Sequence, residues 1–539
     1  MHRRAWSEVL DHLGLVAGMF DELGIGDVLD RALQHTPETR IVTVGSAVKA
    51  MVLNGLGFVN QQLYLVPMFF QNKPTPRLIA PGVDAQHLHD DTLGRTLDML
   101  YDYGVTELYS LIAATAAQRL GLAPTFAHLD STSFHVDGRY NSAEEPDAEV
   151  IHITRGYSRD HRPDLNQVML DLIVEHQAGI PLLMKPLSGN SSDVQNFGQI
   201  VTEHIKQLQT TYGTTYLVAD SALYSEENLQ KLGETGIKWI TRVPATVSEA
   251  QVLLTQADPQ TMALLLEGYR YQTWMSSYGS VPQRWVLCYS EHRRPQAQRL
   301  VNKHWLKQSE AEAKAFQKLS RTAYACATDA QQALTTFAQG LQATALHEGT
   351  VHPTPRYRMR GRPSQDTPPA WVVYHITGAL ASSLAAHEAL VAPQSCFILA
   401  TNELDDRTLP AHALLEGYKG QQQAERGFRF LKDPRFLASS LYLKKPERIM
   451  ALLMVMTVCL LVYAALEYRI RKTLKAHQAT FPNQKGQPVQ NPTARWVFQY
   501  FVGIHLLRVP GQGAFVLNLN DQHQRLLRLL GRSYEAFYS

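Results

Sequence analysis

The chain has 539 residues, of which 45% are hydrophobic and 19% charged, and its formal net charge is +2 at pH 7. This composition excludes an intrinsically disordered chain, and the length exceeds one ordinary hydrophobic core, so we expect about three or four domains. A nearly balanced charge allows a nucleic-acid partner only where basic side chains gather locally. The four cysteines have spacings that fit neither a zinc site nor a disulfide framework, which favours a reducing, intracellular setting.

Residues 1–115 are predicted to form an all-helical N-terminal domain. Segments such as GLVAGMFDELGIGDVLDRAL and DDTLGRTLDMLYDYGVTELYSLIAATAAQRL carry apolar residues at helical spacing, and Asp90 or Asp91 is a candidate N-cap. A domain of this kind either binds DNA ends or only packs against the rest of the chain, and the sequence leaves both readings open. The first residues contain acidic side chains and no clean apolar run, so no signal peptide is expected.

Residues 116–244 are predicted to form the first part of an α/β domain. The segment PTFAHLDSTSFHVDG alternates apolar with small polar side chains, which is typical of a strand. After an acidic loop we expect strands at NQVMLDLIVEH and IPLLMKPLSGN, a helix near 194–209, a strand at TTYLVADSALY, a short helix at 225–233 and a strand at IKWITRVP. Three meandering strands followed by alternating helices and strands indicate a mixed sheet flanked by helices.

From residue 245 to 394 the regular pattern is lost, and we interpret this segment as an insertion domain. Basic side chains gather in it at HRRPQAQRLVNKHWLK and at RYRMRGRP. The α/β pattern resumes at SCFILATNEL, so residues 395–475 are interpreted as the second part of the interrupted domain. Residues 476–539 begin as a Pro/Gln/Asn-rich linker and end in a small apolar segment, a C-terminal tail that is a candidate for dimerisation.

An uncharged run, IMALLMVMTVCLLVYAAL at 449–466, lies at the lower length limit for a membrane-spanning helix. It is solitary and continues from a charged helix, so we predict a helix buried in the protein core instead.

The charged stretch is EGYKGQQQAERGFRFLKDPRF, at 416–436. On a helical wheel of about 100° per residue, Tyr418, Gln421, Glu425 and Lys432 lie within roughly 60° of one another. Such a face is either merely solvated or turned towards a polar ligand.

Three carboxylates can meet if this helix packs on the predicted sheet. Asp130 lies within the first strand and Asp220 ends another, although Asp220 could instead cap the next helix. With Glu425 they would form a cluster whose mutual repulsion a protein can sustain by binding divalent cations, and their oxygens suit Mg²⁺ or Mn²⁺. Two such ions about 3.5–4 Å apart activate the attacking oxygen and stabilise the leaving oxygen of a phosphodiester. His128 and His135 lack ligand spacing and are expected to be structural.

These motifs together resemble DDE transposases of the IS4 superfamily, most closely the IS1634-type insertion-sequence transposases. LDSTSFHVDG resembles the strand of the first aspartate and LVADSALYSEENL that of the second. YKGQQQAERGFRFLK matches the family signature Tyr-x2-Arg-x3-Glu-x6-Lys at Tyr418, Glu425 and Lys432, with Gln421 in place of the arginine. FILATNEL and LKKPERIMAL also resemble the family, and the resemblance covers roughly residues 120–475.

The resemblance implies an RNase H-like catalytic domain interrupted by an insertion between the second aspartate and the glutamate. It implies that Asp130, Asp220 and Glu425 hold two Mg²⁺ ions, which Mn²⁺ can replace. The implied reaction nicks DNA at terminal inverted repeats and joins the freed 3′-OH ends to target DNA. The implied partners are double-stranded transposon-end and target DNA and, in the synaptic complex, a second copy of the chain, with no membrane. The implied location is the bacterial cytoplasm, on the nucleoid when DNA is bound.

The same resemblance implies DNA contacts on the polar helix. Tyr418 and Lys432 are expected to contact the DNA backbone. Gln421 can hydrogen-bond a phosphate, but it lacks the charge and the fork geometry of arginine. Arg429 lies one helical turn past the glutamate on the same face, so we expect it, in preference to Arg426, to compensate.

Two further DNA contacts are expected outside this helix. Phe397 stands where related transposases place an aromatic side chain against a flipped base. Its rivals in the insertion are Trp274, Trp285 and Trp305. Arg358 and Arg360, in RYRMRGRP, are expected to touch DNA phosphates, although a solvated basic loop is the alternative.

Three other functions stay open at this point. An RNase H-like nuclease would use the same carboxylates without strand transfer. A catalytically inactive DNA-binding relic is a second alternative, which the replacement of the signature arginine by Gln421 suggests. A metal phosphohydrolase acting on small molecules is a third, but the large basic insertion has no obvious use there.

Overall fold

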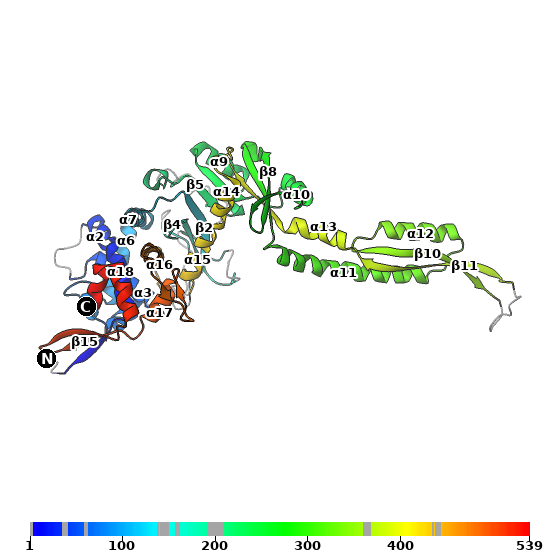
Figure 1. Ribbon diagram of the computed structural model, residues 1–539. Coiled ribbons are helices and arrows are strands. Elements are labelled where there is room, and N and C mark those ends of the chain that lie inside the picture. Colours follow the sequence, from blue (N-terminus) through cyan, green and yellow to red (C-terminus); the bar gives the residue numbers. More distant parts are fainter. Residues whose placement is uncertain are drawn as a thin grey trace.

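The computed structural model of the chain describes residues 4–34, 41–58, 63–136, 140, 150–156, 162–191, 204, 208–358, 368–433, 436 and 443–539. It consists of a helical body, a central sheet and a long arm (Figure 1). Both termini lie in the body at one end of the molecule, and the arm extends from the sheet at the other end.

A nine-stranded sheet forms the centre of the molecule, in the order β4-β3-β2-β5-β6-β12-β9-β8-β7. Its first five strands are β2 (Phe126–His135), β3 (Gln167–Glu175), β4 (Pro181–Ser188), β5 (Tyr216–Ala219) and β6 (Lys238–Arg242). The strands β2, β3 and β4 pair antiparallel in sequence, whereas β5 pairs parallel with β2 and β6 parallel with β5. Helix α9 (Glu226–Thr235) makes the crossover between β5 and β6 that a parallel pair requires. This mixed sheet confirms the predicted RNase H-like fold class.

Burial on both faces explains the composition of these strands. Every residue of β3 is buried, and its segment QVMLDLIVE is a nearly continuous apolar run rather than an alternating one. Helix α7 (Val105–Leu120) packs on the edge strand β4, where the Tyr109 hydroxyl donates a hydrogen bond to the Pro181 carbonyl at 2.9 Å. The N-terminal region therefore supports the β4 edge of the sheet directly.

The segment interpreted as an insertion, residues 245–394, is divided between the sheet and the arm. After α10 (Ser248–Thr255), strands β7 (Ala263–Leu266), β8 (Tyr269–Ser276) and β9 (Gln283–Ser290) extend the sheet. Strand β12 (Cys396–Thr401) joins the two halves, because it pairs antiparallel with both β6 and β9. Half of the residues of β8 are exposed, so its sequence carries little of the apolar pattern that marks a strand of a sheet core. The chain leaves the sheet only after β9.

The arm begins with α11 (Arg294–Arg321) and α12 (Ala327–Gln339) and continues as the ribbon of β10 (Thr344–Arg356) and β11 (Trp371–Ser382). Helix α13 (Leu384–Gln394) returns the chain to β12 (Figure 1). The buried carboxylate of Glu312 on α11 accepts hydrogen bonds from the Gln342 and Thr344 backbone N–H groups, each at 2.8 Å. Desolvation raises the pKa of Glu312, but hydrogen bonds from the Thr344 hydroxyl and from the Gln342 and Ala343 N–H groups outweigh it and hold the pKa at about 2. The ionised carboxylate thus ties the base of the ribbon to α11.

The predicted core helix is α16 (Pro446–Ala476), and its most apolar 18-residue window is 89% buried inside the protein. This burial confirms a helix of the protein core. The N-terminal helices that contact α16 are α1 (Leu13–Glu22), α3 (Val44–Leu56), α6 (Asp90–Tyr103) and α7. Arg448, near the start of α16, makes two hydrogen bonds of 2.7 Å to the Asp98 carboxylate of α6. The remaining helices of this region are α2 (Ile25–Ala32), α4 (Val66–Phe70) and α5 (Thr75–Leu78).

The N-terminal region and the C-terminal tail form one structural unit. Strand β1 (Trp6–Val9) pairs antiparallel with β15 (His505–Val509), which pairs with β16 (Gly513–Leu517), so the N-terminal region is helical apart from β1. The tail also contains β13 (Phe481–Pro482), β14 (Pro488–Val489), α17 (Ala494–Tyr500), α18 (Asp521–Leu530) and α19 (Arg532–Glu535). A role of the tail in dimerisation stays a prediction.

Tyr534 of α19 joins the two ends of the chain. It is fully buried, and its hydroxyl donates a hydrogen bond to the Glu22 carboxylate of α1. A Cβ at Gly18 of α1 would lie only 2.7 Å from the Tyr534 ring, so the ring rests on helix backbone that a larger residue would block.

Replacing Tyr534 by alanine is expected to lower the free energy of unfolding by about 3–5 kcal/mol, because it leaves a cavity between α1 and α19. Urea unfolding followed by circular dichroism measures this change. Tyr64, which is 58% exposed, gives the matched control, and Tyr64→Ala should change the stability by less than about 0.5 kcal/mol. Equal losses in both variants would show that the contact between the termini contributes nothing.

Candidate active site

Asp130 and Asp220 lie next to each other at the end of a parallel strand pair. Leu129 of β2 pairs with Ala219, the last residue of β5, so the two aspartates follow in register. Asp130 is buried, and its Oδ1 accepts a hydrogen bond from the Ser131 backbone N–H at 2.8 Å. Asp220 Oδ1 accepts one from the Ala222 N–H at 2.9 Å, so the carboxylate does cap the following turn. Asp220 therefore both caps the following turn and lies beside Asp130.

The predicted polar helix is divided into α14 (Ala411–Lys419) and α15 (Gln422–Leu431). Gly420 and Gln421 lie between them with φ/ψ values of −58°/−19° and −51°/−28°, so the backbone stays close to helical across the break. Tyr418 consequently lies on α14 and Glu425 on α15, while Lys432 directly follows α15.

Helices α14 and α15 run alongside strand β2. The contacts occur in the same order along helices and strand: Gly417 against Phe126, Gly420 against His128, Gln421 on Leu129, and Lys432 over Phe134. Glu425 lies between the last two contacts, so α15 carries it past the part of β2 that holds Asp130. The helix also contacts β3, the antiparallel neighbour of β2.

The phenol of Tyr418 lies near both Glu425 and Asp220. Burial raises the pKa of Tyr418, the positive charges of Arg242 and Arg293 lower it, and the negative charges of Asp220 and Glu425 raise it. Both carboxylates therefore lie within electrostatic reach of one half-buried phenol. Together with the strand register, this places all three predicted carboxylates in one region of the molecule.

The chemistry of this donor set fits a divalent cation. Carboxylate oxygens are the ligands that hard cations such as Mg²⁺ prefer. The side chain of Glu425 is 57% exposed, so it has room to turn towards the two aspartates. Within the described ranges, no three His, Cys, Asp or Glu side chains lie close enough together to hold a metal ion. The donors thus share a region without forming a closed ligand set.

Gln421 is used inside the protein. Its side chain is 8% exposed, and its Nε2 donates a hydrogen bond to the Leu129 carbonyl at 3.0 Å. Desolvation lowers the pKa of the neighbouring His128 to about 4, and the Gln421 side chain opposes this shift. His128 is therefore a neutral, buried side chain, in line with its predicted structural role. The predicted contact of Gln421 with a DNA phosphate would have to replace its bond to the strand.

The two predicted cations of α15 differ in their surroundings. Arg429 is 78% exposed, and its guanidinium lies 4.0 Å from the Glu425 carboxylate. Lys432 is half-buried, with its Nζ 5.9 Å from the centroid of the Phe134 ring. Arg429 accordingly stands beside the third carboxylate, and Lys432 stands where α15 ends above β2.

The remaining residues that were predicted to contact DNA are either buried or far from the carboxylates. Phe397 of β12 is 7% exposed, and the Arg293 guanidinium lies over its ring at 5.2 Å. Trp285 is fully buried in β9, whereas Trp274 of β8 is 44% exposed. Arg358 is exposed just beyond β10, towards the far end of the arm, and Arg360 lies outside the described residues (Figure 1).

Arg242 and Arg293 were not predicted from the sequence to lie near this region. Arg242 ends β6, and Arg293 immediately precedes α11, yet both influence the Tyr418 phenol. Arg242 could have been found from its place at a strand end, where ligand-binding residues of α/β sheets gather. Arg293 lies in the noted basic cluster HRRPQAQRLVNKHWLK, but nothing in the sequence separates it from its neighbours there.

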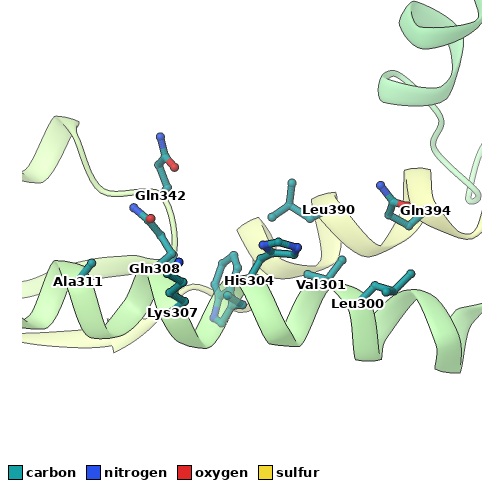
Figure 2. A pocket seen from close by; sticks show the side chains of 11 residues that line it. Leu300, Val301, His304, Lys307, Gln308, Ala311, Gln342, Leu390 and Gln394 are labelled. Atoms are coloured by element: carbon teal, nitrogen blue, oxygen red, sulfur yellow. The ribbon is translucent and has the colours of Figure 1, made fainter. Parts of the chain in front are cut away.

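A large cavity lies on the arm and takes no part in this site. It measures about 730 Å³ and lies between α11 and α13, with Leu300, His304 and Leu390 among its lining residues (Figure 2). Trp305, a predicted rival of Phe397, also lines it. None of its described lining residues is a carboxylate.

The mixed sheet has the RNase H-like fold class, with Asp130 within β2 and Asp220 directly after the neighbouring strand β5. The chain belongs to the family described as "Transposase DDE domain", whose model matches residues 123–462, more than half of the chain. This match confirms the family expected from the sequence, and with it a transposase that acts on DNA. Residues 6–114 match a second model, described as "Domain of unknown function (DUF4277)".

The comparisons with individual proteins add little. No curated protein matches the chain. Among solved structures, the chain is similar to the one described as "Cryo-EM structure of piggyBac transposase synaptic complex with hairpin DNA". The identity is 9%, the match covers 93% of this chain and 82% of the other, and the TM-score is 0.37. A TM-score this low carries no argument about fold or function.

Replacing Gln421 by alanine is expected to lower the free energy of unfolding by about 1–3 kcal/mol, because the buried Leu129 carbonyl loses its donor. Thermal and urea unfolding measure the change. Gln422, the exposed neighbour at the start of α15, provides the matched control, and Gln422→Ala should leave stability nearly unchanged. If the two variants unfold alike, the amide of Gln421 does not hold α15 on β2.

Proposed function

We propose that the chain is a cut-and-paste DNA transposase that nicks DNA at terminal inverted repeats and joins the 3′-OH ends to target DNA. The observation that carries the proposal is the gathering of Asp130, Asp220 and Glu425 around the end of the β2–β5 pair. Family membership makes DNA the substrate, and the acidic cluster supplies the groups that phosphodiester chemistry needs.

The three carboxylates would act together as metal ligands in this proposal. Asp130, Asp220 and Glu425 would hold two Mg²⁺ ions, or Mn²⁺ in their place, which when bound activate the attacking oxygen and stabilise the leaving oxygen. The N–H groups that bind Oδ1 of Asp130 and of Asp220 fix the orientation of both carboxylates. Glu425 comes from the exposed side of α15 and completes the set by turning its side chain.

Tyr418, Arg429 and Lys432 would position the DNA backbone beside the carboxylates. The ion pair between Arg429 and Glu425 is exposed and long, so it contributes little stability and can exchange readily. When Glu425 turns to a cation, the guanidinium of Arg429 is released for a phosphate. Lys432 is held over the Phe134 ring and presents its charge as a point contact.

We also propose that two copies of the chain act together, because joining two transposon ends requires two active sites in one complex. An RNase H-like nuclease would use the same carboxylates but would stop after cutting. The joined product, in which a transposon end is covalently linked to target DNA, therefore separates the two functions.

Asp130→Ala and Glu425→Ala are each expected to abolish cleavage, because each removes a carboxylate of the cation site. The assay uses labelled duplexes carrying the terminal inverted repeat, incubated with protein and Mg²⁺ or Mn²⁺, with chelation by EDTA as a further test. The control is Glu416→Ala, an exposed carboxylate on α14, which should cleave at the wild-type rate. Tight DNA binding by the wild-type protein without cleavage in either metal would instead indicate an inactive DNA-binding relic.

Changing Arg358 and Arg360 together to alanine is expected to reduce the salt dependence of DNA binding. Each phosphate contact contributes about 0.9 to the slope of log K against log salt, so the slope should fall by about 2. Binding is measured between low and moderate salt by fluorescence anisotropy. Arg528→Ala, on the exposed side of α18, is the control. An unchanged slope in the double variant would show that the end of the arm does not contact phosphates.

A further inference from the structure

Arg293 stands between the arm and the carboxylate region. It follows β9 and directly precedes α11, the first helix of the arm. Its side chain is half-buried, and its guanidinium carbon lies 5.2 Å from the centroid of the Phe397 ring, an arrangement typical of a cation–π contact. The ring supports one face of the guanidinium and leaves its N–H edges available to a ligand.

Among the described residues, no carboxylate neutralises this guanidinium. Across the described residues, the side chains of Arg293 and Arg242 make no ion pair within 4.0 Å and no hydrogen bond. The next residue, Arg294, differs because it lies 2.7 Å from the Glu388 carboxylate. Burial lowers the pKa of Arg293, and the nearby charge of Arg242 lowers it further. Two partly buried like charges repel each other, and a bound anion would relieve this repulsion.

The anion would lie next to the carboxylates. The Tyr418 phenol is within electrostatic reach of Arg293 and also of Asp220 and Glu425. A phosphodiester cut at the carboxylates therefore places a neighbouring phosphate of the same strand near Arg293. Guanidinium groups bind phosphate oxygens in pairs, with stronger and more directional bonds than a neutral amide makes.

Gln421 occupies the position of the signature arginine, so another residue would have to supply the positive charge. The surroundings of the nearby side chains indicate which residue can do so. Gln421 is turned inward to the Leu129 carbonyl, so it presents neither charge nor amide to the DNA. Arg429 is exposed and already faces Glu425. Arg242 and Arg293 are both half-buried cations near Tyr418 that make no ion pair among the described residues. Arg293 is the better candidate of the two, because its guanidinium is held over the Phe397 ring.

We infer that Arg293 replaces the missing signature arginine and binds the DNA phosphate adjacent to the scissile one. The inference rests on the proposed transposase function and assigns a DNA contact to the junction between sheet and arm. Arg293 is thereby a DNA-binding residue of the active site, with Phe397 as the platform that holds its plane.

The test combines protein variants with single neutral phosphates in the DNA. Methylphosphonate replaces one phosphate at a time on either side of the cleavage position, and the Kd of each duplex is measured for the wild-type protein and for Arg293→Ala. At the contacted phosphate, neutralisation should weaken wild-type binding about tenfold, because a charge-assisted hydrogen bond is lost. The same change should have almost no effect on Arg293→Ala, and Arg293→Lys should fall between.

The controls separate this contact from a structural effect. Arg294→Ala, the ion-paired neighbour, should respond to every methylphosphonate as the wild type does. A loss of affinity that is equal at all phosphates in Arg293→Ala would overturn the inference, as would a phosphate-specific effect in Arg429→Ala alone. Cleavage by the wild-type protein is scored in parallel. Its absence contradicts the proposed function, whereas normal cleavage with no phosphate-specific effect contradicts only the role of Arg293.

Discussion

The close approach of α14 and α15 to strand β2 is the contact on which the active-site region depends. Gly417 and Gly420 allow it, because a Cβ would lie 2.8 Å from the Phe126 ring at the first position and 2.6 Å from His128 Nε2 at the second. The hydrogen bond from Gln421 to the Leu129 carbonyl then fixes the register between helix and strand. Through this register, Glu425 reaches the strand of Asp130, although almost three hundred residues separate them.

The body of the protein holds this contact from the other side. A Cβ at Gly427 of α15 would lie 3.0 Å from a methyl group of Leu460 on α16, so α15 is packed between β2 and the core helix. The N-terminal helices surround α16, and the C-terminal helix α19 closes on α1. The apolar run that follows the charged stretch therefore has a direct purpose, because it supports the helix that carries the third carboxylate.

The fold class and the neighbouring positions of Asp130 and Asp220 could be predicted because they depend on local pattern. Strands β2 and β5 show it in their apolar residues, and the register of a parallel pair then places Asp130 beside Asp220. The inward turn of Gln421 could not be predicted, because a helical wheel gives the direction of a side chain but not what lies there. The place of β8 in the sheet was hidden by its exposed residues, and the stacking of Arg293 on Phe397 joins separate segments of the chain.

Tyr418 lies where two opposite charge environments meet. Asp220 and Glu425 are negative charges near the phenol, and Arg242 and Arg293 are positive charges near it. A phosphodiester backbone beside bound metal ions has this same alternation, since positive ions flank the scissile group and the next phosphate is again negative. Separate charged groups of one sign repel each other before DNA binds, and ligands of opposite sign relieve the repulsion in both pairs together. Cation binding at the carboxylates and phosphate binding at the arginines should therefore reinforce each other near the phenol.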